Sequence, residues 1–202
     1  MKISATLALL VSSATAFKGL RLRSAATLAR AAQVDGSGGT LNDQILYQLN
    51  ILRQAHGLNT VVWNDELAVD MQAWADSCPQ KDGGGHGGPV GNQNLASFVP
   101  CDDDCKRQEG PSWGWYTEVL LWNYETDSCG TGDWMDCGHF SNSMSAAVTS
   151  IACGSSTCYN PNINGNDSLV WCNYVDAQIP PAIPRTNIEY EEIKASLTAG
   201  FA

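Results

Sequence analysis

Histidine is the residue type in this chain that points most directly to chemistry. The sequence holds three histidines, His56, His86 and His139. An imidazole can bind a metal ion or act as a general base near neutral pH. Ser141 and Ser143 follow His139, but nothing nearby marks an oxyanion hole or an orienting acid, so we interpret both as capping or surface serines. The sequence also lacks a Gly-x-Ser-x-Gly elbow, an HExxH motif and a P-loop.

Short motifs follow one another along the chain in a fixed order. These motifs are Trp63-Asn64-Asp65-Glu66-Leu67-Ala68, His86, Asn92-Gln93-Asn94-Leu95-Ala96, Trp115-Tyr116-Thr117-Glu118, Cys137-Gly138-His139-Phe140, Ile151-Ala152-Cys153-Gly154 and Val170-Trp171-Cys172-Asn173-Tyr174. Each motif alone is weak, but in this order they resemble the CAP superfamily of cysteine-rich secretory, antigen 5 and pathogenesis-related 1 proteins, which share the SCP domain. The resemblance implies an α+β fold, a three-layer α-β-α sandwich with a small antiparallel sheet.

The resemblance also implies a candidate site. In this family two histidines and two glutamates converge in a central cleft, and the histidines can bind zinc or another divalent metal. His86 and His139 match the two histidines, and Glu118 matches one acid. Gln93 stands where the family has its second glutamate. Glutamine can hydrogen-bond but cannot balance the charge of a metal, and loss of a carboxylate partner weakens metal binding. His86, His139 and Glu118 with one water would remain an acceptable zinc set.

For function, the resemblance implies non-enzymatic extracellular binding of a lipid or sterol beside a modified His/Glu cleft. One alternative is a metal-dependent hydrolase that uses His86 and His139 as ligands and Glu118 as the base, although Gln93 counts against it. Another alternative is a defence-related interaction module that acts through an acidic surface. Five aromatic residues crowd one predicted helix, where most would enter the core and some could line an apolar groove for the ligand. They are Trp113, Trp115, Tyr116, Trp122 and Tyr124.

The first 37 residues have the composition of targeting segments. Lys2, the apolar run from Leu7 to Val11 and the small residues Ala14-Thr15-Ala16 predict a signal peptide over residues 1–16, and hence secretion. Residues 17–37 form a basic leader, which holds no acid from Phe17 to Gln33, and Gly36 to Gly39 are interpreted as a linker. An alternative interpretation is a bipartite plastid presequence. No stretch is long enough to predict a membrane span.

The basic leader conceals the charge of the remaining chain. Five of the 11 basic residues and none of the 21 acids lie before residue 34, which leaves a net charge of −15. Such acidity argues against nucleic acids and anionic membrane surfaces as partners. The densest acidic cluster, Asp102-Asp103-Asp104, is interpreted as a solvated loop because the spacing of a calcium-binding loop is missing.

Eight cysteines in an exported chain predict a disulfide framework, although the sequence alone leaves the connectivity open. The family resemblance implies three bridges, Cys78–Cys158, Cys129–Cys137 and Cys153–Cys172. Cys101 and Cys105 would then remain, and they are close enough in the chain to pair locally. Asn166-Asp167-Ser168 is a glycosylation acceptor in a predicted hairpin loop.

The elements that must position these residues form one domain, residues 38–180. A helix is predicted from Thr40 to His56, with Asp43 placed for a capping box, and others from Asn64, over 113–124 and after Gly138. His56 is interpreted as structural, because the dipole at its helix end favours a protonated imidazole. Residues 147–153 and 168–175 are the predicted strands, joined by a turn region over 160–166. The tail, 181–202, is predicted to hold a loosely docked helix over 187–199, opened by Thr186 and Glu189.

Overall fold

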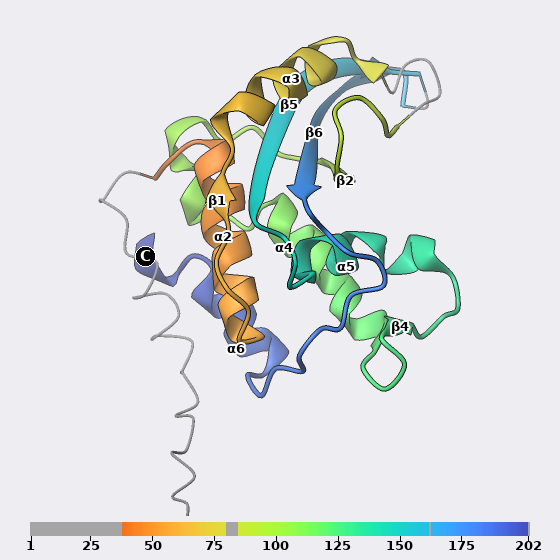
Figure 1. Cartoon of the computed structure of the whole chain (residues 1–202). Helices are drawn as coiled ribbons and strands as arrows, with labels where there is room; N and C mark the ends of the chain where they lie inside the picture. The colour runs from red at the N-terminus through yellow and green to blue at the C-terminus, as the bar shows by residue number, and fades with distance from the viewer. Residues whose placement is uncertain (1–37, 80–84, 162, 202) are drawn as a thin grey trace, which may run out of the picture.

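A computed structural model of the chain describes residues 38–79, 85–161 and 163–201 (Figure 1). The predicted signal peptide and the basic leader therefore lie outside the described residues. Within them, no helix is both long and apolar enough to cross a membrane.

A four-stranded sheet, in the order β1-β5-β6-β2, forms the middle layer. Its long hairpin consists of β5 (Ser150–Asn160) and β6 (Gly165–Val175). The predicted strand 168–175 lies within β6, whereas the predicted strand 147–153 only overlaps β5, which begins at Ser150 and continues to Asn160. β2 (Asn92–Ser97) pairs with β6 antiparallel. The short β1 (Val62–Trp63) runs parallel to β5, so the sheet is mixed rather than wholly antiparallel as expected. The sequence did not predict β2, because asparagine is depleted in strands.

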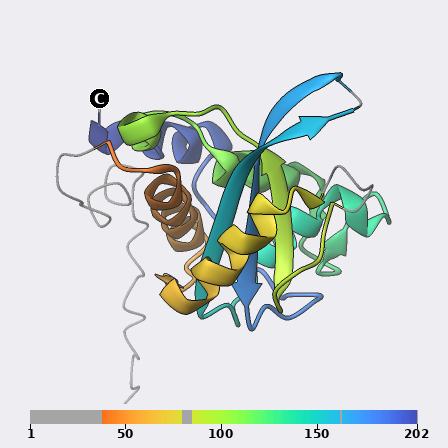
Figure 2. The same cartoon turned by 90° about the horizontal axis from the view of Figure 1, so that it is seen from above.

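Alternating side chains of this hairpin build two cores, one on each face of the sheet. Ala152, Leu169 and Trp171 face α3 (Asp65–Asp76), whereas Val170 and Cys172 belong to the larger core on the opposite face. That second face is covered by α4 (Pro111–Tyr116) and α5 (Gly138–Met144), with α2 (Leu41–Ala55) packed against both (Figures 1 and 2). The fold is therefore the expected α+β sandwich of three layers.

Close packing of α3 on the sheet requires a glycine in β5. A Cβ atom added at Gly154 would lie 2.1 Å from the carbonyl oxygen of Met71 in α3. No side chain fits in that space without moving the helix. Gly154 therefore sets the short distance between α3 and the sheet.

Helix starts follow the predicted caps, but the third predicted helix is wrong in its second half. Thr40 and Asp43 form a capping box on α2, and the Asn64 side chain caps α3. The helix expected over 113–124 ends at Tyr116 and continues as η3 (Thr117–Leu121), a 3₁₀ segment. It then becomes β3 (Trp122–Asn123), which pairs with β4 (Ser128–Cys129). Gly114 and the β-branched Thr117 and Val119 are weak helix formers, so tertiary pairing prevails.

All eight cysteines form disulfides, and one of the four bridges links two layers. The structure pairs Cys78 with Cys158, Cys129 with Cys137, Cys153 with Cys172 and Cys101 with Cys105. These are the pairs that the family resemblance and the local spacing implied. Cys78–Cys158 ties the end of α3 to β5, and Cys101–Cys105 closes η2 (Asp102–Arg107) on itself.

The C-terminal tail packs into the main core, which corrects the expectation of a loosely docked helix. The helix α6 (Tyr190–Ser196) is shorter than predicted, and no side chain caps its first turn. Ile183, Ile193 and Leu197 are all buried in the larger core. A short 3₁₀ segment, η5 (Ala199–Phe201), follows. The domain therefore extends beyond the expected boundary at residue 180, since the apolar side chains of the tail complete the core.

Gly38 and Gly39, expected to end a flexible linker, are also part of the fold. Both residues are buried, and their carbonyl groups accept hydrogen bonds from the backbone of Lys106 and Cys105. Both glycines therefore belong to the packed domain.

Candidate functional site

A cleft of about 680 Å³ opens between the loop 85–91, the start of β2, η4 (Trp134–Asp136) and α5. It brings together three of the four predicted site residues. Its lining is His86, Gly87, Gly88, Pro89, Val90, Gly91, Asn92, Gln93, Trp134, Met135, Gly138, His139, Asn142 and Ile179. Glu118, the fourth predicted residue, does not line the cleft and lies behind His139.

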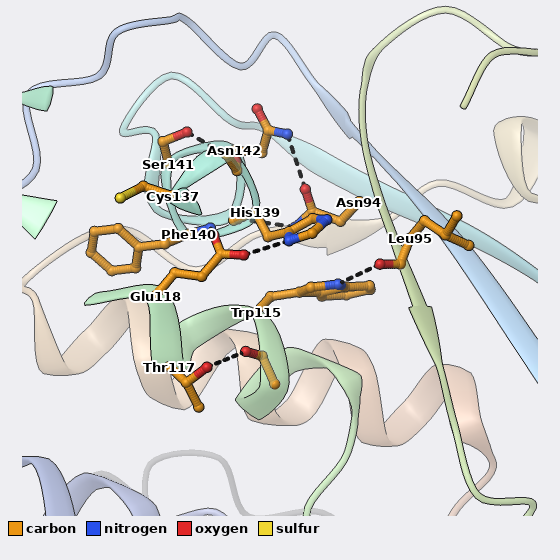
Figure 3. A network of polar contacts seen from close by, with 12 residues as sticks. Asn94, Leu95, Trp115, Thr117, Glu118, Cys137, His139, Phe140, Ser141 and Asn142 are labelled. Carbon is orange, nitrogen blue, oxygen red and sulfur yellow. Dashed lines mark hydrogen bonds and ion pairs between the residues drawn. The ribbon is translucent and has the colours of Figure 1, made fainter. Parts of the chain in front are cut away.

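Glu118 orients His139 from behind. The ring Nδ1 of His139 donates to Glu118 Oε1 at 2.5 Å, and the backbone N–H of Phe140 donates to Oε2 at 3.0 Å (Figure 3). Because the Glu118 carboxylate can only accept a hydrogen bond, the ring proton is assigned to Nδ1 of His139. The Nε2 atom of His139 is therefore the ring nitrogen that is available to a group bound in the cleft.

Buried polar side chains hold α5, the helix that carries His139. The Asn94 amide donates to the carbonyl of His139, and the Asn142 amide donates to Asn94 Oδ1 (Figure 3). At the C-terminal end of α5, Arg53 donates to the carbonyls of Ser143 and Ser145. Burial lowers the pKa of Arg53 to about 10. The sequence did not reveal these supporting roles, because a polar residue in a helix or strand carries no sign of a distant partner.

The loop with His86 lies across the cleft from α5. Partial burial and then the nearby His139 imidazole lower the pKa of His86, and a hydrogen bond with the Gln93 side chain opposes the shift. The two imidazoles are thus close enough to influence each other. The Gln93 amide also accepts from the Gly87 N–H and donates to the Gly87 carbonyl.

The residues present do not fit a metal centre with three protein ligands. Both oxygens of Glu118 already accept hydrogen bonds from His139 and Phe140. Gln93 is neutral and bound to backbone, which leaves only two imidazoles. Among residues 38–79, 85–161 and 163–201, no group of three or more His, Cys, Asp or Glu side chains is gathered to hold a metal ion.

A second hollow, of about 480 Å³, lies between η3, β3 and the tail. We refer to it as the aromatic groove. Its lining is Tyr116, Val119, Leu120, Trp122, Tyr124, Arg185, Thr186, Ile188, Glu189, Tyr190 and Ile193. Three of the five aromatic residues singled out in the sequence line this groove, and the other two, Trp113 and Trp115, are buried in the core.

The third histidine, His56, joins the floor of the aromatic groove to the tail. It is 3% exposed, its Nδ1 donates to the Pro184 carbonyl at 2.6 Å, and its Nε2 accepts from the Tyr116 hydroxyl at 2.9 Å. Burial lowers the pKa of His56, and the hydrogen bond to Pro184 opposes this shift. The structural role is as expected, but the protonated state suggested by the helix dipole is wrong, because desolvation outweighs the dipole.

Asn166, the predicted glycosylation acceptor, lies at the exposed start of β6. The far end of the β5–β6 hairpin extends beyond the helices (Figure 2). A glycan at Asn166 would therefore meet no packed element, and its attachment stays a prediction.

Comparison with known proteins decides the family. A sequence model described as the cysteine-rich secretory protein family, CAP, matches residues 46–174, which is more than half of the chain. The chain belongs to the CAP family. It is 28% identical over 143 residues to the "Cysteine-rich venom protein Mr30" of Conus marmoreus, covering 65% of this chain and 43% of that protein. It is 26% identical over 143 residues to the "Pathogenesis-related protein PR-1" of Medicago truncatula, covering 67% and 73%.

Two further proteins match this chain over very different shares of their own length. The "Peptidase inhibitor 16" of Mus musculus is 26% identical over 152 residues, which are 72% of this chain but 28% of that protein. The solved structure of MpPR-1i has a TM-score of 0.45 at 14% identity, covering 75% of this chain and 91% of that one. A family of secretory proteins and four disulfides fit an extracellular CAP protein, and nothing in these comparisons supports the plastid alternative.

Proposed function

We propose that this CAP protein is an extracellular, non-enzymatic binding protein that holds a lipid or sterol in the aromatic groove. One observation carries the proposal: eight of the side chains that line the groove are apolar or aromatic. These are Tyr116, Val119, Leu120, Trp122, Tyr124, Ile188, Tyr190 and Ile193. A concave, mostly apolar site with a few polar groups is typical of small-ligand binding.

The aromatic groove combines buried, rigid side chains with an exposed one. Tyr116 and Trp122 are buried and fixed by ring contacts with Phe140, so they form a floor that cannot collapse. Leu120 is 69% exposed, which leaves its side chain free to cover a ligand. The groove thus combines a preformed floor with exposed apolar surface that a bound ligand would remove from water.

Polar groups at the groove select an amphipathic ligand. The guanidinium of Arg185 lies 4.9 Å from the centroid of the Tyr124 ring. The acidic side chain Glu189 lines the same groove. A sterol hydroxyl or a fatty-acid carboxylate could hydrogen-bond to Arg185 while the apolar body lies along the aromatic rings. This arrangement supports a lipid or sterol over a fully apolar compound.

Neighbouring leucines of η3 allow a matched test. Leu120 lines the groove, whereas Leu121, 43% exposed, is not part of its lining. We expect Leu120→Asp to weaken binding of a fluorescent sterol or a fluorescent fatty acid by about tenfold or more, because covering one leucine contributes about 1.5–3 kcal/mol. Leu121→Asp should bind like the unmodified protein. Equal binding by all three proteins, or binding by none, would contradict the proposal.

A second candidate function is hydrolysis in the cleft, favoured by the contact between Glu118 and His139. With Nδ1 held by the carboxylate, Nε2 of His139 is placed to take a proton from water, which is the orientation that a general base requires. Glu118 then orients the base rather than acting as the base that the sequence suggested. Ester hydrolysis that is lost in both His139→Ala and Glu118→Gln would support this candidate, and equal residual turnover in both variants would count against it.

A further inference from the structure

The side-chain amide of Gln93 makes a set of contacts that only an amide can make. Its Oε1 accepts from the Gly87 N–H at 3.2 Å, and its Nε2 donates to the Gly87 carbonyl at 2.9 Å. The same Nε2 donates to Oδ1 of Asn173 in β6 at 2.8 Å. Gln93 therefore binds the backbone of the loop in both directions and ties it to the sheet.

Asn173 extends this connection along the loop. Its Nδ2 donates to the carbonyls of Pro89 at 2.7 Å and Val90 at 3.3 Å. Beneath the loop, Gly88 lies on the indole of Trp74, where an added Cβ would come within 2.5 Å of the ring. The loop that carries His86 is thus fixed to the sheet at several points and rests on α3.

A glutamate at position 93 could not replace these contacts. An ionised carboxylate only accepts hydrogen bonds, so it would face two other acceptors, the Gly87 carbonyl and Asn173 Oδ1. It would also add a negative charge beside His86, where none of the described residues that line the cleft carries a carboxylate side chain. The glutamine thus fixes the loop and keeps this side of the cleft uncharged.

We propose that Gln93 is a positioning and specificity-determining residue: its amide fixes the loop that presents His86 and keeps the cleft from taking a divalent cation. Cation binding needs charged or unoccupied ligands, and Gln93 supplies neither. The proposal does not depend on which ligand occupies the aromatic groove.

Gln72 provides a matched control for the amide contact. It lies in α3 and binds the backbone of Ser155 in the same two-way manner, donating to the carbonyl at 2.9 Å and accepting from the N–H at 3.2 Å. Gln72 does not line the cleft. Gln72→Glu therefore makes the same change of charge outside the cleft, and it likewise loses two donor contacts, to the Ser155 carbonyl and to Asp76 Oδ1.

The test measures loop order and zinc affinity on the full chain. Backbone ¹⁵N–{¹H} nuclear Overhauser effects should be high for residues 86–91 in the unmodified protein and in Gln72→Glu. They should fall in Gln93→Glu and in Gln93→Met, which keeps the size of the side chain without its hydrogen bonds. By calorimetry, only Gln93→Glu should bind zinc more tightly than the unmodified protein, by about tenfold or more.

Two results would overturn the proposal. An ordered loop in both Gln93 variants would show that the amide does not position it. Zinc binding by the unmodified protein as tight as by Gln93→Glu would show that Gln93 does not exclude cations, and this titration requires no variant to fold. A gain in zinc affinity in Gln93→Met equal to that in Gln93→Glu would assign the effect to mobility rather than charge and would also overturn the claim of specificity.

Discussion

At the scale of single residues, burial and partners decide what the three histidines can do. His86 and His139 face one cleft, and His56 is a neutral residue inside the core. The sequence indicated the cleft residues only through the resemblance of its ordered short motifs to the CAP family. It did not indicate Arg53 or Asn173, whose partners lie far away in the chain.

Protonation of His56 should destabilise the fold in acid. Burial lowers the pKa of His56 below its ordinary value of 6.5, so the unfolded chain binds the proton first. The stability that neutral His56 contributes is therefore fully present above pH 6.5 and is lost as the pH falls from 6.5 through the folded-state pKa. Urea unfolding at pH 7.5, 6.5 and 5.5 should show a falling free energy of unfolding.

The control for this pH dependence replaces each shifted histidine in turn. His86→Gln should keep most of the decline, because His86 is exposed, whereas His56→Gln should flatten the curve between pH 6.5 and 5.5. An unchanged decline in His56→Gln would assign the acid sensitivity to other groups.

At the scale of elements, local patterns predicted where helices begin better than where they end. Caps at Thr40 and Asn64 gave two correct starts, because a cap is a contact between residues three positions apart. The third helix ends early at Tyr116, since β3 and β4 pair and Trp122 packs against Phe140. Such endings depend on tertiary contacts that no local pattern contains.

The packed tail predicts a large loss of stability for a single large-to-small substitution at Leu197, the C-cap residue of α6. Leu197 is fully buried in the larger core, so Leu197→Ala should reduce the free energy of unfolding by about 2–5 kcal/mol. Glu191→Ala, an exposed change in the same helix, should alter it by less than about 0.5 kcal/mol. Urea denaturation of the two variants gives the comparison, and similar small losses would mean that the tail is loosely docked after all.

At the scale of the whole molecule, two cores hold three layers together, and the disulfide Cys78–Cys158 ties the end of α3 to the sheet. The acidic composition argued against nucleic-acid partners, and the family resemblance supplied the architecture that composition could not. The mixed sheet and the part of the tail in the core were not predictable, because both depend on which distant segments meet. Cys78–Cys158 spans 80 residues of chain, whereas Cys101–Cys105 spans four.

Loop length predicts unequal contributions from these two bridges. In the chain-entropy account, the long bridge contributes about 4 kcal/mol and the short one about 2 kcal/mol. Paired Cys→Ser variants should therefore differ, with Cys78→Ser/Cys158→Ser the less stable in thermal unfolding. A short-bridge variant that melts first would show that local strain or the buried position of Cys105 outweighs loop length.

The central claim is that the aromatic groove holds a lipid or sterol. The most direct test is to photo-crosslink the full chain with a photoactivatable sterol and with a photoactivatable fatty acid. Mass spectrometry would then locate the modified residues. Label should concentrate on residues 116–124 and 185–193, the two walls of the groove, and unlabelled ligand should compete it away. Competed label on the cleft segments 86–93 or 134–142 instead, or no label that unlabelled ligand displaces, would contradict the assignment of the groove as the binding site.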